Sequence, residues 1–279
     1  AALFPAASPR GSVVLSPGRT EVVEKYYEVV EDLRRRGFTV LVHDWRGHGL
    51  SGRLTGDPLK GHASGWRSYL GDFRRVLDAY ETRLPRPWLA LGHSMGGGLT
   101  ALALAQGERR FAAAVLSAPM LGLDLGGRPL RLVRTAAWAL SRLGASALYA
   151  DGPGDPLGGT FEANVLTHDR RRWERTSALL AAHPELRLGG PTWGWLDLAF
   201  ALSARLTRLP AGGLALPLAV VTAGDERLVD NAAARAFAAK AGARQVEVPG
   251  AFHELLMETD ALRAVFWAEF DAIAALVPA

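Results

Sequence analysis

The feature that most constrains this chain is the run Gly92-His93-Ser94-Met95-Gly96, in which a serine stands between two glycines at fixed spacing. The strand-like residues 88–91 precede it, and a helix-like run of small and apolar residues follows it. A serine at such a strand-to-helix turn has a strained backbone, and glycines two positions away on each side avoid clashes there. The helix that follows directs its dipole and free N–H groups at the serine. We therefore predict that Ser94 is a nucleophile at the edge of a sheet.

The order of segments predicts a mostly parallel sheet flanked by helices. Short β-branched or apolar runs alternate with amphipathic segments of helical length, which is the pattern of βαβ units. The predicted strands are residues 12–16, 39–44, 88–92, 113–117, 218–223 and 244–248. The predicted helices are residues 22–36, 67–83, 95–106, 231–241 and 255–276.

The alternation of strands and helices breaks once, after Pro119, and resumes near Leu218. The intervening segment has a mostly helical pattern with Gly/Pro breaks and is too long for a plain loop. We predict a core of residues 1–120 and 210–279 and a helical cap, residues 121–209, inserted between core strands. Together with the serine turn, this is the organisation of the α/β-hydrolase fold: a mostly parallel central sheet, flanking helices and an inserted cap.

A serine hydroxyl needs a base, and the base needs a carboxylate that orients it. His253 follows the last predicted strand and lies at the carboxyl edge of the sheet, where open α/β sheets bind ligands. We predict that His253 is the base. The acid precedes the histidine in this fold, and two adjacent residues, Asp225 and Glu226, follow the preceding strand. We assign Asp230 to the cap of the next helix.

The loop after the first predicted strand contains Pro17-Gly18-Arg19. In this fold, one oxyanion donor is a backbone N–H of that loop, and the other belongs to the residue after the nucleophile. We therefore predict an oxyanion hole formed by the backbone N–H groups of Arg19 and Met95. The Arg19 side chain should lie near the mouth of the site, where it either pairs with an anionic headgroup or is solvated.

Composition excludes several kinds of site and partner. The chain has no Cys, which excludes disulfide scaffolds, Cys-ligated metals and cysteine nucleophiles. A net charge of +4 without basic runs between stacking aromatics argues against a nucleic-acid partner. No apolar stretch is long enough to span a membrane, and residues 1–9 lack the basic start of a signal peptide. The expected location is the cytoplasm.

The predicted cap is basic, with eleven Arg against eight Asp and Glu in residues 121–209. Within it, residues 128–143 have the pattern of a basic amphipathic helix with one Trp. Such a helix either lies on an anionic membrane surface or packs its apolar side on an acyl pocket with its Arg side in solvent. The alternative to a location in the cytoplasm alone is therefore a peripheral position on the anionic surface of the inner membrane.

Several stretches along nearly the whole chain carry a family resemblance. They include Pro17-Gly18-Arg19-x-Glu21, Asp44-Trp45-Arg46-Gly47-His48-Gly49-x-Ser51-Gly52, Asn164-Val165-Leu166-Thr167-His168, Gly189-Gly190-Pro191-Thr192 and Gly250-Ala251-Phe252-His253-Glu254. The chain resembles the serine aminopeptidase-like α/β-hydrolases, in the branch of monoacylglycerol lipases and the bacterial inner-membrane lysophospholipase. Pro17-Gly18 replaces the family's usual His-Gly, which fits the lysophospholipase better. Relative to the family, the chain begins at the second strand, so one antiparallel edge strand is expected to be missing.

The resemblance implies hydrolysis of the single acyl ester of a lysophospholipid, a small-molecule partner, through an acyl-Ser94 intermediate. It implies no metal and no organic cofactor. The family register around Val229 places Glu226 at the acid position, so we favour Glu226, with Asp225 as the alternative. The activity of a monoacylglycerol lipase or of a general carboxylesterase is the alternative, because the fold of a protein does not determine its substrate. A non-catalytic lipid-binding protein on this scaffold is disfavoured, because every candidate of the triad is present.

Overall fold

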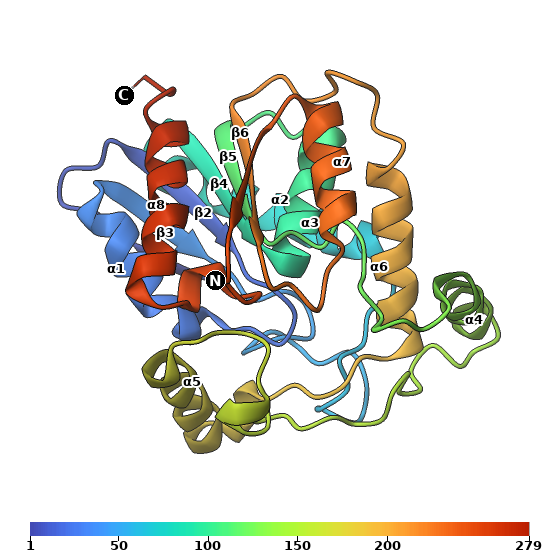
Figure 1. The fold of residues 1–279 in the computed structure, drawn as a ribbon. Helices are drawn as coiled ribbons and strands as arrows, with labels where there is room; N and C mark the ends of the chain where they lie inside the picture. The colour runs from blue at the N-terminus through green and yellow to red at the C-terminus, as the bar shows by residue number, and fades with distance from the viewer. Residues whose placement is uncertain (279) are drawn as a thin grey trace.

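The computed structural model describes residues 1–278, and the strands within them form one seven-stranded sheet in the order β1-β3-β2-β4-β5-β6-β7 (Figure 1). Every neighbouring pair is parallel except β1 and β3, which are antiparallel. The strands are β1 (Ala2–Phe4), β2 (Gly11–Ser16), β3 (Phe38–Val42), β4 (Trp88–His93), β5 (Phe111–Ser117), β6 (Leu218–Ala223) and β7 (Arg244–Val248). All six predicted strands are present, and β1 is a strand that the sequence pattern did not reveal.

Helices cover both faces of this sheet. The α-helices are α1 (Tyr27–Arg35), α2 (Trp66–Tyr80), α3 (Ser94–Ala105), α4 (Leu130–Arg142), α5 (Arg170–Ala182), α6 (Trp193–Leu206), α7 (Asn231–Ala241) and α8 (Asp260–Ala274). The short 3₁₀ turns are η1 (Val23–Tyr26), η2 (Glu81–Arg83), η3 (Phe161–Ala163), η4 (Pro184–Leu186) and η5 (Leu255–Met257).

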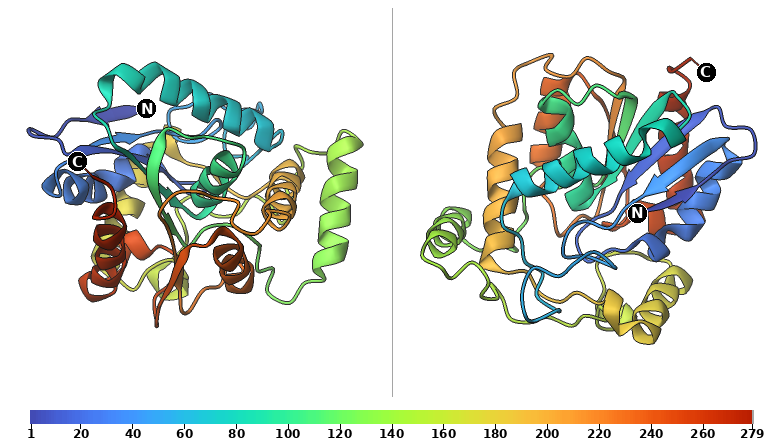
Figure 2. Two further views of the ribbon diagram at one scale, coloured as in Figure 1. Left: turned by 90° about the horizontal axis from the view of Figure 1, so that it is seen from above. Right: turned by 180° about the vertical axis from the view of Figure 1, so that it is seen from behind.

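The strand residues alternate between two apolar layers, as the two-residue period of a strand requires. In β2, Val13 and Leu15 join the layer under α1 and α8, and Val14 joins the layer under α2, α3, α6 and α7. Figures 1 and 2 show these two helix layers on opposite sides of the sheet. The central strands are apolar on both faces, which is typical of a buried parallel sheet. The carboxyl ends of these strands therefore meet at one rigid edge.

The prediction of one helix over residues 255–276 is wrong. The chain forms the turn η5, becomes extended at Glu258 and Thr259, and then begins α8 at Asp260. The buried Glu258 carboxylate accepts hydrogen bonds from the backbone N–H groups of Phe252 and His168. This carboxylate therefore joins Phe252 of its own loop to His168, which lies 90 residues before Glu258 in the sequence.

The segment between β5 and β6 contains α4, α5 and α6, and these helices are placed differently. α6 packs along α2 and α3 and buries Leu198, Ala199 and Leu202 in the core. α4 packs on the outer side of α6, and Figure 2 shows it at the periphery of the molecule. α5 lies across the ends of α1 and α8 (Figure 1). Among residues 1–278, no helix has both the length and the apolar character that crossing a membrane requires.

Candidate functional site

Ser94 lies at the sharp turn between β4 and α3, with the backbone φ of +50° that a non-glycine residue rarely adopts. Glycines allow this turn to form. A β-carbon on Gly96 would overlap the carbonyl oxygens of Ser16 and Pro17, and one on Gly92 would overlap Gly97. The turn therefore presents the Ser94 side chain at the carboxyl edge of the sheet, as the sequence predicts.

His253 connects Ser94 to Glu226 through two short hydrogen bonds. Its Nε2 lies 2.8 Å from Ser94 Oγ, and its Nδ1 lies 2.7 Å from Glu226 Oε2. The side chains of His253 and Glu226 are only 5% and 2% exposed. Three residues that are far apart in the sequence thus form one continuous chain of hydrogen bonds, from the hydroxyl to a shielded carboxylate.

The carboxylate of Glu226 is bound at both oxygens. Oε1 accepts the backbone N–H groups of Arg227, Leu228 and Val229 at 3.0, 2.8 and 3.3 Å. Burial would raise the pKa of Glu226, but its hydrogen bonds from His253 and the backbone lower it below its ordinary value. Asp225 is exposed, and among residues 1–278 it is Glu226 that bonds to His253.

The loop of Arg19 lies directly beside the nucleophile. A β-carbon on Gly18 would come within 3.1 Å of Ser94 Cβ, so a glycine is needed for this close approach. The Gly18 N–H donates to the Glu21 carboxylate, which holds the loop in place. Met95 lies in the first turn of α3, where backbone N–H groups have no acceptor within the helix. That the N–H groups of Arg19 and Met95 bind an oxyanion stays a prediction.

A buried ionic network lies behind the site, and sequence analysis did not identify it. Lys25 Nζ lies 2.7 Å from Glu21 Oε1 and 2.5 Å from Glu254 Oε1. Tyr26 also donates to Glu21 at 2.6 Å. Burial alone would raise the pKa of Glu21, but the charge of Lys25 and these hydrogen bonds lower it to about 2. Lys25 thereby joins the loop before α1 to the residue that follows His253.

His93 is a second histidine close to the triad. Its ring centroid is 5.0 Å from that of His253, and its Nδ1 lies 3.1 Å from the carbonyl oxygen of Ser117. Burial lowers the pKa of His93 to about 4, so its ring is neutral at ordinary pH. A neutral ring adds no positive charge beside the imidazole that bonds to Ser94.

A cavity of about 870 Å³ opens over Ser94 and His253. This volume lies within the usual range of pockets that bind small organic ligands. Much of its wall comes from the segment between β5 and β6. The apolar part of the wall includes Leu123, Leu125, Val133, Leu166, Trp173, Leu180, Trp193 and Leu196. Within residues 1–278, no group of three or more His, Asp or Glu side chains is arranged to hold a metal ion.

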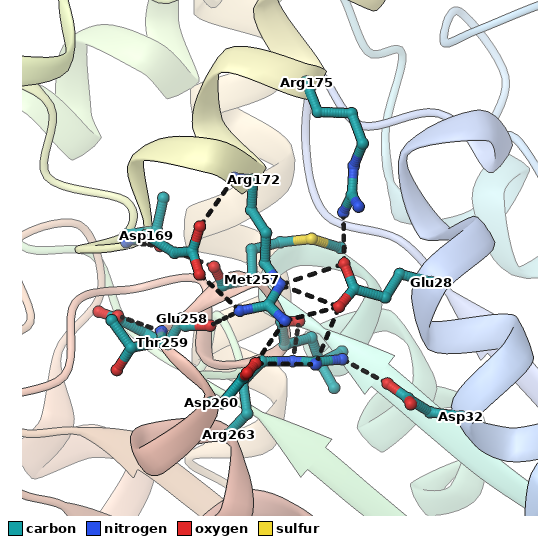
Figure 3. A network of polar contacts seen from close by, with 12 residues as sticks. Glu28, Asp32, Asp169, Arg172, Arg175, Met257, Glu258, Thr259, Asp260 and Arg263 are labelled. Carbon is teal, nitrogen blue, oxygen red and sulfur yellow. Dashed lines mark hydrogen bonds and ion pairs between the residues drawn. The ribbon is translucent and has the colours of Figure 1, made fainter.

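Arg172 on α5 anchors one wall of this cavity to the core (Figure 3). Its side chain is 2% exposed and contacts Glu28 of α1 at 2.6 Å and Asp260 of α8 at 2.5 Å. Arg263 of α8 also reaches Glu28, at 3.2 Å. The sequence did not reveal this link, because the partners Glu28 and Asp260 lie on α1 and α8, far from Arg172 in the chain.

Comparisons with known proteins agree with this geometry. The family model described as Serine aminopeptidase, S33 (Hydrolase_4) matches residues 7–260. Lysophospholipase L2 of Escherichia coli strain K12 is 35% identical over 264 residues, which cover 91% of this chain and 77% of that protein. A monoacylglycerol lipase of Mycolicibacterium smegmatis is 29% identical and covers 92% of this chain and 85% of its own length.

A solved structure of similar fold is the monoacylglycerol lipase of Paleococcus ferrophilus, with a TM-score of 0.76 at 21% identity. The match covers 98% of this chain and 97% of that one. At this identity, the likeness shows the fold alone, and that fold is the expected α/β-hydrolase architecture. The family match extends over nearly the whole chain, so this chain belongs to the serine aminopeptidase S33 family.

Proposed function

We propose that this chain is a serine hydrolase that cleaves a carboxylic ester through an acyl-serine intermediate. Ser94 acts as nucleophile, His253 as general base and Glu226 as the acid that orients the imidazole. The hydrogen-bond chain from Glu226 through His253 to Ser94 Oγ supports these roles most directly. The backbone N–H groups of Arg19 and Met95 act as oxyanion donors.

In the first half of the reaction, His253 Nε2 takes the proton of Ser94 Oγ as that oxygen attacks the ester carbonyl. The carbonyl oxygen becomes negative, and the two N–H donors stabilise it. The imidazolium then protonates the leaving alcohol as the ester bond breaks. In the second half, water gives a proton to His253, its oxygen attacks the acyl-Ser94 carbonyl, and the fatty acid leaves as the proton returns to Ser94.

The substrate that the observations favour is a lysophospholipid. The cavity has a long apolar wall for one acyl chain, and the segment that forms it would act as a cap over the core. The 35% identical relative is named a lysophospholipase. Relatives named monoacylglycerol lipases make a monoacylglycerol the second candidate. Initial rates on lysophosphatidylethanolamine, monoolein and nitrophenyl butyrate distinguish the two from a general carboxylesterase.

The variant Ser94→Ala tests the mechanism. Removal of a nucleophile from such a triad lowers kcat by about 10⁶-fold, and some background rate remains from the oxyanion hole. We expect ester hydrolysis and labelling by a fluorophosphonate probe to disappear while circular dichroism stays that of the parent protein. Full activity of Ser94→Ala on both lysophospholipid and nitrophenyl butyrate would contradict the proposed mechanism.

We also propose that α4 contacts an anionic membrane surface at the cavity mouth. Its exposed apolar side chains include Leu132 and Trp138, at 68% and 54% exposure, and Leu143, which directly follows the helix, is 80% exposed. Arg131 and Arg134 are exposed on the same helix. Apolar residues beside basic ones are typical of helices that lie in the interface plane of a bilayer.

Vesicle sedimentation tests this contact. We expect binding to phosphatidylglycerol vesicles that exceeds binding to phosphatidylcholine vesicles and decreases with salt. The double variant Arg131→Glu/Arg134→Glu should lose the binding to phosphatidylglycerol vesicles. The control Arg75→Glu, on the exposed side of α2, should retain that binding. Equal binding of the parent protein and both variants would exclude α4 as the contact.

A further inference from the structure

Five basic side chains line the cavity, and three of them already have carboxylate partners. These three are Lys25 with Glu21 and Glu254, Arg128 with Asp151, and Arg172 with Glu28, Asp169 and Asp260. The other two, Arg19 and Arg227, have no carboxylate of residues 1–278 at ion-pair distance. Two arginines of the cavity wall thus have no ion-pair partner of their own in the described part of the chain, and the same wall includes the carboxylates of Asp124 and Asp155.

These two arginines lie in different surroundings. Arg227 is exposed, and its guanidinium lies over the ring of Phe252. Arg19 is half-buried, with its guanidinium carbon 5.3 Å from the ring centroid of Trp195. Within residues 1–278, the one hydrogen bond of its guanidinium goes from Nη1 to the carbonyl oxygen of Gly189, at 2.9 Å. Most of its N–H donors are thus left for a ligand in the cavity.

The Arg19 side chain is also held in a fixed position close to the reacting atoms. Its aromatic neighbour Trp195 donates from Nε1 to Met95 Sδ at 3.3 Å, and Met95 directly follows Ser94. A β-carbon on Gly61 would collide with Arg19 Nη1, so a glycine leaves room for the guanidinium. Burial lowers the pKa of Arg19 to about 10, which leaves the group charged at neutral pH.

Arg19 offers hydrogen-bond donors at two positions, its backbone N–H and its guanidinium, which suit the ester and the phosphate of a lysophospholipid. The Arg19 backbone N–H is the proposed donor to the ester carbonyl oxygen. Two separations are similar. The number of bonds from the Arg19 backbone nitrogen to its guanidinium carbon is about the number from the ester carbonyl carbon to the phosphorus atom of a lysophospholipid. A guanidinium binds phosphate oxygens through parallel N–H donors, and partial removal from water strengthens that attraction.

We propose that the Arg19 guanidinium binds the headgroup phosphate of the substrate and selects phosphate-bearing single-chain lipids over uncharged monoacylglycerols. This inference rests on the proposed ester hydrolase function and adds the residue that reads the headgroup. It assigns to the Arg19 side chain a role in specificity that is separate from the oxyanion role of its backbone.

The test compares kcat/KM for 1-oleoyl lysophosphatidylethanolamine with that for monoolein, which has the same acyl chain. In Arg19→Met, we expect the ratio of the two values to fall about 10- to 100-fold, as for loss of hydrogen bonds to a charged group. The fall should arise mainly from a higher KM for the phospholipid. Arg19→Lys keeps the charge without the parallel donors and should recover part of the ratio. The control Arg75→Met, which removes an exposed arginine of α2 outside the cavity, should keep the ratio within about twofold.

A second measurement separates a headgroup from free phosphate as the ligand. Glycerophosphoethanolamine should inhibit monoolein hydrolysis by the parent protein and inhibit Arg19→Met much less. Inorganic phosphate that inhibits as strongly, with the same dependence on Arg19, would overturn the headgroup assignment. An unchanged ratio in Arg19→Met, or an equal fall on both substrates, would overturn the inference and leave Arg19 as a structural link to Gly189. A parent protein that hydrolyses none of these esters would instead overturn the proposed function and the inference with it.

Discussion

At the scale of single residues, the two oxygens of Glu226 have separate tasks. Oε2 accepts a hydrogen bond from His253, and Oε1 accepts three backbone N–H groups from the turn that follows. The turn fixes the carboxylate, and the carboxylate fixes the ring, so that Nε2 points at Ser94. The adjacent Asp225 is exposed, and it is Glu226 that bonds to His253.

The first prediction compares Glu226→Gln with the matched control Asp225→Asn. An amide at position 226 favours the wrong tautomer of His253, so kcat on nitrophenyl butyrate should fall by about 10³- to 10⁴-fold. Asp225→Asn should retain kcat within about twofold, because this exposed carboxylate does not contact the ring. The reverse order of effects would assign the acid to Asp225.

The positions of these residues could be predicted to different extents. Ser94 has a local signature, because the glycines of its turn are adjacent in sequence. His253 could be placed through the chain order of the fold and the end of a strand. The same reasoning left Asp225 and Glu226 open as the acid, and only the register of the family resemblance favoured Glu226. Lys25 could not be identified as part of the site. Its environment depends on Glu254, and only the folded chain brings these two residues together.

At the scale of elements, Lys25 connects two loops that both face the reacting atoms. It bonds Glu21, which accepts the Gly18 N–H of the Arg19 loop, and Glu254, which directly follows His253. Burial raises the pKa of Glu254, and the opposite charge of Lys25 offsets only part of that rise. The single lysine thus stands between two buried carboxylates that would otherwise repel each other.

The second prediction is that Lys25→Met destabilises both loops. Loss of the buried cation should lower the free energy of unfolding by about 3–5 kcal/mol, since two buried carboxylates lose their partner. The kcat value should fall more than KM rises, because the loop that contains the proposed oxyanion donor Arg19 loses its support. Urea denaturation and steady-state kinetics measure the two effects.

A double variant supplies the control for this prediction. Adding Glu254→Gln to Lys25→Met removes one of the two like charges, so it should recover part of the lost stability. A loss below about 1 kcal/mol in Lys25→Met would mean that the network contributes little. The same conclusion would follow if the double variant were no more stable than the single one.

Long elements could be predicted better than short or irregular ones. The helix over residues 231–241 matches its predicted bounds, because Asp230 caps it and Gly242 ends it with a positive φ. The strand β1 has only three residues, and its pairing with β3 rather than its own pattern makes it a strand. The break before α8 involves a contact of Glu258 with His168, which is remote in sequence. Tertiary contacts therefore decide the features that the sequence pattern did not show.

At the scale of the whole molecule, α5 is attached to the core by charge, while α4 is attached through its contact with α6. The third prediction concerns Arg172, whose guanidinium bridges α5 to α1 and α8. Arg172→Met should lower the free energy of unfolding by about 3 kcal/mol. This value is at the low end for the loss of one partner of a buried ion pair, because Glu28 still contacts Arg175 and Arg263. Urea denaturation measures this loss, and Arg171→Met, an exposed neighbour, is the control.

The last prediction is the acid dependence of that attachment. Burial would raise the pKa of Glu28, but hydrogen bonds from Arg172 and Arg175 and the charge of Arg263 lower it to about 2. A carboxyl whose folded pKa lies below its unfolded value of about 4.3 stabilises the fold at higher pH and loses that effect on acidification. We therefore expect the parent protein to exceed Glu28→Gln in free energy of unfolding by about 1–2 kcal/mol at pH 7, allowing for solvent screening.

That difference should stay constant down to about pH 5.5, shrink between about pH 4.5 and 2, and vanish below about pH 2. Subtracting the variant isolates Glu28 from the other carboxylates of the network, which titrate in both proteins. Urea denaturation at a series of pH values measures it. A difference as large at pH 2.5 as at pH 7 would mean that Glu28 acts through its shape and packing rather than its charge. The ionic attachment of α5 would then lie with Asp260, the carboxylate of α8 that also contacts Arg172.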